Sequence, residues 1–112
     1  MAQGAGAVFT EDEARLVAVD AAMGFLNSKD GPAERLVEQG YAPPLREALT
    51  ITSVQFVKDA RKVSSPYVTS EFSRPMSIWT VSFSVEGLGL VEVRLEDGTG
   101  TLRGATALPL AR

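Results

Sequence analysis

WTVSFSV at residues 79–85 and VEVRL at residues 91–95 alternate apolar and polar side chains, and this alternation decides the fold. Because successive side chains of a strand point to opposite faces of the sheet, each stretch has one apolar and one polar side. The two stretches predict an antiparallel hairpin. We expect the core side to carry Trp79, Val81, Phe83, Val85, Val91, Val93 and Leu95. We expect the solvent side to carry Thr80, Ser82, Ser84, Glu92, Arg94 and Glu96.

The loop between these stretches sets which residues face each other. A two-residue turn would place Phe83 opposite Glu92 and so put the two apolar sets on different faces. A three-residue loop at residues 87–89 pairs Phe83 with Val93 instead, and Gly89 suits the left-handed conformation that such loops need. We therefore expect the three-residue loop.

A final strand is expected to follow the hairpin and to contain Leu102 on the core side. Asp97 and Gly98 suit a tight turn into this strand, and a turn centred on Gly98 and Thr99 would keep Leu102 inward as well. The residue pattern fits both turns equally.

The first half of the chain opens with a helix signal. Thr10 followed three residues later by Glu13 is a capping box, and Glu11 and Asp12 add negative charge where the helix dipole favours it. Capping explains this acidic cluster better than metal binding, because adjacent helical residues point in different directions. Apolar residues follow on two adjoining stripes, so we expect a largely covered helix.

The middle of the chain predicts a second, shorter helix and two further strands. Pro32 suits the first turn of a helix that runs to Val37, and Gly40 suits the cap behind it. β-branched residues at 50–57 favour a strand that ends in an exposed basic turn at 58–62. Another strand is expected at residues 67–72, before Ser73, Arg74 and Pro75 interrupt it.

Together these elements predict a two-layer α+β domain, with N-terminal helices packed on one face of an antiparallel sheet of four to five strands. We expect residues 1–9 to form a flexible leader and residues 10–112 to form a single domain. An exposed sheet edge would allow pairing with a peptide or with a second copy of the chain as a homodimer.

Composition excludes several kinds of chemistry. The 112 residues include no cysteine and no histidine, so thiolate catalysis, disulfides and the usual general base near neutral pH are excluded. We expect no enzyme activity, no cofactor and no metal site. The net charge of −3 offers no attraction to a phosphate backbone, and we expect no nucleic-acid partner. No apolar run reaches the roughly 18 residues of a membrane span.

Trp79 has two interpretations. Its place in the alternation suggests that it closes the end of the core, with its indole N–H near a polar partner. Alternatively, Trp79, Tyr67 and Arg74 form a binding site by lining a rim for a peptide or a small ligand. The turn at Asp97–Gly100 lacks the spacing of phosphate and calcium loops and is interpreted as structural.

Two family resemblances add functional expectations. Residues 78–83 resemble the tryptophan-bearing strand of the PepSY family, and residues 91–102 resemble its strand with an acidic turn and a Thr-Gly pair. The capped helix from Glu11 is similar to the opening helix of that family. This resemblance implies a non-catalytic protein-interaction or regulatory module, commonly extracytoplasmic or in the cell envelope. Such a module would bind or restrain a protease or another envelope protein.

The order of early helices followed by several strands also resembles the cone-shaped α+β fold of nuclear transport factor 2 relatives. In that fold, helices cover a curved sheet that can enclose a pocket. The second resemblance implies a small-ligand-binding domain. The acid-base dyad of the catalytic members is not identifiable in this sequence.

Overall fold

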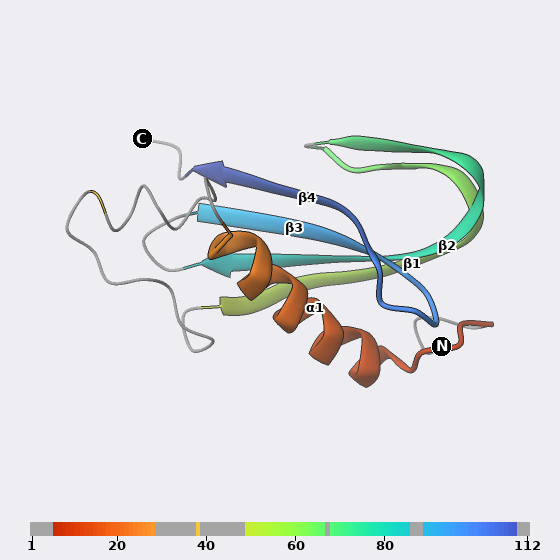
Figure 1. The fold of residues 1–112 in the computed structure, drawn as a ribbon, viewed down its shortest axis with the longest axis horizontal. Coiled ribbons are helices and arrows are strands. Elements are labelled where there is room, and N and C mark those ends of the chain that lie inside the picture. Colours follow the sequence, from red (N-terminus) through yellow and green to blue (C-terminus); the bar gives the residue numbers. More distant parts are fainter. Residues whose placement is uncertain (1–5, 29–37, 39–48, 67, 86–88, 110–112) are drawn as a thin grey trace.

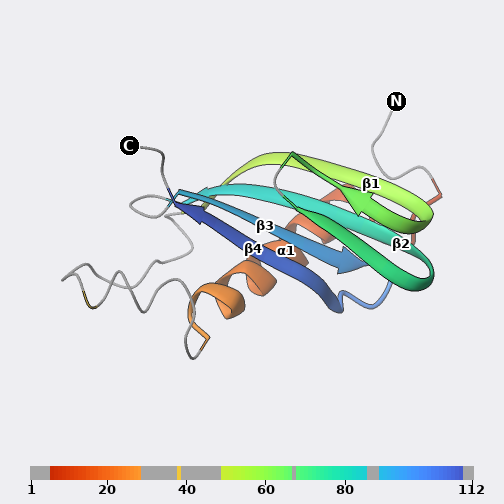
Figure 2. The same ribbon diagram turned by 90° about the horizontal axis from the view of Figure 1, so that it is seen from above.

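The computed structural model describes residues 6–28, 38, 49–66, 68–85 and 89–109 (Figure 1). These residues form α1 (Glu11–Leu26), β1 (Leu49–Ser64), β2 (Thr69–Val85), β3 (Gly89–Glu96) and β4 (Leu102–Pro109). The strands make one antiparallel sheet in the order β1-β2-β3-β4, and α1 crosses one face of it (Figures 1 and 2). The α+β class and the four-stranded antiparallel sheet are confirmed. The second helix expected at residues 32–37 and its cap at Gly40 lie outside the described residues.

The start of α1 follows the capping box. The Thr10 hydroxyl accepts a hydrogen bond from the Glu13 N–H at 3.1 Å, and Glu13 Oε1 accepts one from the Thr10 N–H at 3.1 Å. Two of the N–H groups that a helix leaves unpaired at its start are thereby satisfied. At the other end, the Asn27 side chain donates to the Met23 carbonyl at 3.0 Å.

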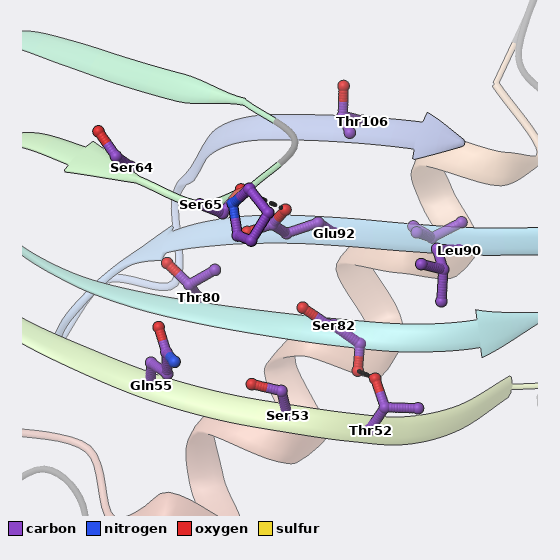
Figure 3. A pocket seen from close by; sticks show the side chains of 12 residues that line it. Thr52, Ser53, Gln55, Ser64, Ser65, Thr80, Ser82, Leu90, Glu92 and Thr106 are labelled. Atoms are coloured by element: carbon purple, nitrogen blue, oxygen red, sulfur yellow. Dashed lines mark hydrogen bonds between the residues drawn. The ribbon is translucent and has the colours of Figure 1, made fainter.

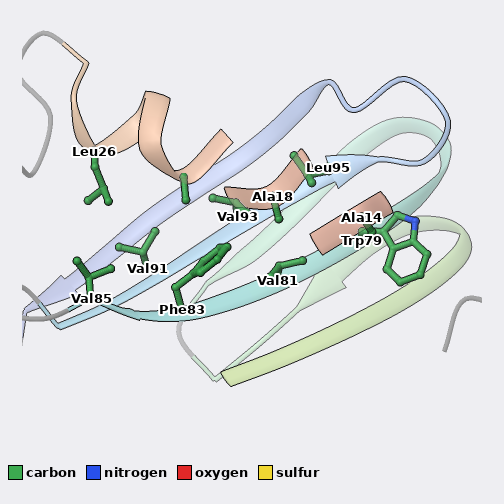
Figure 4. Packing of buried hydrophobic residues seen from close by; sticks show 11 residues of the cluster. Ala14, Ala18, Leu26, Trp79, Val81, Phe83, Val85, Val91, Val93 and Leu95 are labelled. Carbon is green, nitrogen blue, oxygen red and sulfur yellow. The ribbon is translucent and has the colours of Figure 1, made fainter. Parts of the chain in front are cut away.

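The core lies between α1 and the sheet (Figure 4). The helix buries residues at four-residue spacing, and three of the four are alanines, which let the helix backbone come close to the strands. Buried residues of the cluster are Ala14, Ala18, Ala22, Leu26, Trp79, Val81, Phe83, Val85, Val91, Val93 and Leu95. All seven residues expected on the core side of the hairpin are confirmed there. The wide covered helix face is only partly correct, because Leu16 is 67% exposed.

The expected register of the β2–β3 hairpin is wrong by two residues. Val85 pairs with Gly89, Phe83 with Val91 and Val81 with Val93, so the connecting residues are 86–88, which are not described. Gly89 is the first residue of β3, with φ 133°. Because a shift of two residues leaves every side chain on its own face, the hydrophobic pattern cannot distinguish the two registers.

β1 and β2 are each one long strand with a bend, and the breaks expected at residues 58–62 and 73–75 are wrong. At the bend, residues 72–75 of β2 lie opposite Arg61 alone, between paired positions. Asp59 takes a left-handed conformation with φ 52°, which Asp tolerates better than most residues. Pro75 cannot donate to a strand ladder and lies within this irregular part of the pairing. A bulge therefore bends the strands where termination was expected.

The bend folds the end of the β1–β2 hairpin back over the sheet, on the face opposite α1 (Figures 1 and 2). We call residues 62–66 and 68–71 the hairpin arm. Its tip is closed by a hydrogen bond of 2.9 Å from the Ser65 N–H to the Val68 carbonyl. The arm covers Thr80, Glu92 and Arg94, which are 6%, 5% and 2% exposed. The expectation that these three face solvent is wrong.

The turn before β4 is longer than either alternative considered for it. Gly98 and Gly100 both have positive φ, and the Glu96 N–H donates to the Thr101 carbonyl at 2.9 Å. Leu102 pairs with Leu95 on the side of α1, but it is 42% exposed. Leu102 therefore lies on the expected core side, but it is not buried, because an open groove lies between this edge strand and the helix.

Candidate functional site

The face of the sheet opposite α1 combines polar side chains with burial. Thr80 and Ser82 project from β2 on this face, and they pair with Arg94 and Glu92 of β3. Alternation along the strands places all four on one side. Such a face normally lies in water, but here the hairpin arm lies above it (Figure 3). The result is a polar space between two layers of the same sheet.

A buried ion pair joins the arm to the sheet. Arg94 Nη2 lies 3.4 Å from Glu92 Oε1 and donates to the Val68 carbonyl at 3.0 Å, while Nη1 donates to Ser70 Oγ at 2.7 Å. Ser65 Oγ donates to Glu92 Oε2 at 3.0 Å. Because charges removed from water are costly unless they are paired and hydrogen bonded, these contacts hold the arm in place.

Gly104 makes the close approach of the arm possible. It pairs with Arg94 across β3 and β4, and a Cβ at this position would lie 3.3 Å from Ser70 Oγ. That distance is short for a carbon beside a hydroxyl oxygen that already accepts from Arg94. A side chain at residue 104 would therefore press on the contact between Ser70 and Arg94.

Under the tip of the arm lies a cavity of about 410 Å³ (Figure 3). The first two strands contribute Thr52, Ser53, Gln55, Thr80 and Ser82. The arm contributes Ser64, Ser65 and Pro66, and the last two strands contribute Leu90, Val91, Glu92 and Thr106. The wall is thus rich in hydroxyl groups, with a smaller apolar part and one carboxylate.

One wall group has no partner. Thr80 Oγ1 is buried and makes no hydrogen bond among the described residues. A hydroxyl group can donate one hydrogen bond and accept two, so this atom leaves its full capacity unused. Buried polar atoms in folded proteins almost always have a partner, and an exception of this kind needs an explanation.

A second polar arrangement closes the end of the core at Trp79. The indole Nε1 donates to Asp97 Oδ1 at 3.0 Å, and the same carboxylate accepts from the backbone N–H groups of Val8 at 2.7 Å and Phe9 at 2.9 Å. Burial acts to raise the pKa of Asp97, but these hydrogen bonds and one from the Gly98 N–H outweigh it and hold the pKa below its usual value. Asp97 thus ties the N-terminal segment to the sheet.

Of the three residues predicted as a binding rim, Trp79 and Arg74 do not share one surface. Trp79 is fully buried on the side of α1, with its ring centroid 4.9 Å from that of Phe56. Arg74 is exposed, and its Nη2 atom lies 3.8 Å from Glu96 Oε1. Tyr67 lies outside the described residues. The binding role of these three residues stays a prediction, and the burial of Trp79 favours its interpretation as a core residue.

Sequence reasoning missed the cavity and the ion pair beside it. The alternation predicts that Glu92 and Arg94 are exposed to solvent, because it cannot reveal whether another part of the chain covers the polar face. Their spacing of two residues on a central strand was the available signal, since it places opposite charges on one face.

Among the described residues no group of three acidic side chains is arranged to hold a metal ion. No helix in the described part of the chain is long and apolar enough to cross a membrane.

Comparison of the chain with protein-family models, curated proteins and solved structures finds no match. Functional inference for this chain therefore depends on its own residues and their geometry.

Proposed function

We propose that this chain is a non-catalytic domain that binds a small ligand in the cavity between the hairpin arm and the sheet. The observation that carries the proposal is the cavity itself, whose volume of about 410 Å³ lies within the usual range of ligand pockets, roughly 300–1,000 Å³. Protein interiors are otherwise closely packed. A space of this size, kept open beside a buried ion pair, is a feature that stability alone does not require.

The chemistry of the wall supports binding without catalysis. The described residues of the wall include no lysine or arginine, and Glu92, the one carboxylate among them, is held by Ser65 and Arg94. General acid-base work needs a group that is free to exchange a proton with the substrate. Glu92 would have to leave both partners to do so, whereas the hydroxyl groups of the wall can donate and accept hydrogen bonds without rearrangement.

The proposal also differs in one respect from the cone-shaped resemblance. That resemblance places a pocket between the helices and the sheet, but in this chain the same space is filled by the buried cluster around Phe83. The cavity lies on the other face, under the arm. The ligand site that we propose is therefore built by the bend of β1 and β2, and not by the helical layer.

Screening a fragment library by amide chemical shifts tests the proposal. We expect hits to move the amide signals of residues around the cavity, such as Thr80 and Ser82. Ser82→Phe should fill the cavity and weaken these hits at least tenfold. Ser84→Phe is the matched control, because Ser84 lies on the same strand and face but does not line the cavity. Hits that bind Ser82→Phe and Ser84→Phe equally well would contradict the proposal.

A protein-interaction role, as the PepSY resemblance implies, is the second proposal. The observation that favours it is the open groove between α1 and the edge strand β4, where Leu102 is 42% exposed beside Val17, Ala21 and Phe25. Its occupant would be an apolar segment of an envelope protein, such as a protease. An exposed apolar surface beside an unpaired strand edge suits such a segment.

Crosslinking in the native cell envelope tests this second role. Leu102→Asp should abolish recovery of a specific partner, while Leu16→Asp should not, because Leu16 is exposed on α1 outside the groove. Equal recovery with both variants would remove the groove from consideration.

A further inference from the structure

The wall of the cavity offers hydrogen bonds more than charge. Of the twelve described residues that line the cavity, eight carry a hydroxyl group or an amide, and Leu90 and Pro66 carry apolar side chains. The side chain of the remaining apolar residue, Val91, lies in the core under α1. Hydroxyl and amide groups can act as donors and acceptors, so they suit ligand groups that do the same. Among the described lining residues there is no aromatic ring, so Leu90 and Pro66 are the apolar contacts.

The charges beside the cavity cancel. Glu92 is the one charged residue among the described residues of the wall, and its carboxylate faces the Arg94 guanidinium at 3.4 Å and accepts from Ser65 Oγ at 3.0 Å. An anionic ligand would meet the carboxylate, and a cationic ligand would compete with Arg94 for it. A charged ligand loses its hydration on entering the cavity, and only an unpaired charge of opposite sign in the wall would compensate for that loss. Because Glu92 and Arg94 already pair with each other, neither an anionic nor a cationic ligand gains here.

We propose that the ligand of this cavity is a neutral small molecule with hydroxyl or amide groups. This inference rests on the proposed ligand-binding function and names the chemical class of the ligand. The pairing of Glu92 with Arg94 argues for a neutral ligand, and the hydroxyl-rich wall argues for hydroxyl or amide groups on it.

A fragment library with equal numbers of neutral, anionic and cationic compounds tests the inference by amide chemical shifts. A matched set sharpens it: propionamide, propionate and propylamine have one carbon skeleton and three charges. We expect cavity hits to be mainly neutral and propionamide to bind more tightly than its two charged relatives. Cavity hits that are mainly anionic or cationic would overturn the neutral class while leaving the proposed function standing. An absence of any cavity hit would overturn both.

Discussion

The two faces of the sheet differ in the kind of side chain that they bury. The face under α1 is apolar, with Trp79, Phe83 and Leu95 fully buried against the helix. The face under the hairpin arm is polar and also covered, with Glu92 and Arg94 paired inside it and a cavity beside them. The first face supplies stability through the area removed from water. The second keeps buried charges and an open space, neither of which is needed to hold a domain together.

This difference teaches that burial and apolarity are separate properties. Alternation along β2 and β3 assigns each residue to a face, but the arm decides whether that face meets water. A covered polar face is costly unless each group finds a partner. Most groups on this face do so, and Thr80 Oγ1 and Arg94 Nε are the exceptions among the described residues.

The largest effect is expected from removing one half of the buried ion pair. Arg94→Met leaves the Glu92 carboxylate buried without its counter-charge and removes the bonds to Ser70 and Val68. We expect the free energy of unfolding to fall by about 3–5 kcal/mol. Denaturant unfolding measures this change.

The matched control is Arg103→Met, because Arg103 pairs with Glu96 at the surface, where an ion pair contributes less than about 1 kcal/mol. The double variant Arg94→Met, Glu92→Leu should recover most of the stability, since no unpaired charge remains. A loss for Arg94→Met no larger than that for Arg103→Met would show that the arm does not bury the pair in solution, and the comparison of the two faces would fail.

The face under α1 follows from the sequence, whereas the arm does not. Alternation identifies Trp79, Phe83 and Val93 as core residues, and the capping box at Thr10 locates the start of the helix. The strand alternation and the capping box each involve residues that are close together in the sequence, and each predicts one structure only. The hairpin register has two solutions that differ by two residues, and both keep every side chain on its face.

The cavity depends on a bend that leaves little trace in the residue pattern. The bend combines a left-handed Asp59 with a bulge opposite Arg61, and Asp is common in turns as well as in bulges. Residues 58–62 are therefore as typical of a turn between strands as of a bend within one strand. Gly104 is more informative about the arm, because its missing side chain leaves room for Ser70. This role can be recognised only when the position of the arm is known.

A medium effect is expected at the polar anchor of the helix-covered face. Asp97→Asn keeps one acceptor oxygen but loses the charge that serves Val8, Phe9 and Trp79. We expect a loss of about 1–2 kcal/mol in the free energy of unfolding. Asp59→Asn is the control, since Asn also tolerates the left-handed conformation of that residue.

The same anchor makes stability depend on pH. The folded pKa of Asp97 is below its usual value, so the unfolded chain binds more protons between the two pKa values. The contribution of Asp97 is therefore complete above the ordinary pKa and is lost as the pH falls through the lowered one. Unfolding curves across acidic pH should show this loss, and it should be smaller in Asp97→Asn. The remaining slope comes in part from Glu96, whose pKa is lowered chiefly by its hydrogen bond with Arg103. Identical slopes in the variant and the parent would contradict the anchor.

The smallest effects are expected from two glycine substitutions with opposite signs, one on each layer. Gly104→Ala places a Cβ 3.3 Å from Ser70 Oγ, so we expect a loss of about 1 kcal/mol as the arm shifts from Arg94. Gly24→Ala adds a Cβ that meets nothing within 4 Å on α1, and we expect a gain of about 0.5–1 kcal/mol from helix propensity. Denaturant unfolding measures both changes, and hydrogen exchange of Ser65 and Val68 amides should rise in Gly104→Ala only. A gain in both variants would mean that the arm tolerates a side chain at residue 104, so that the contact between Ser70 and Arg94 does not depend on Gly104.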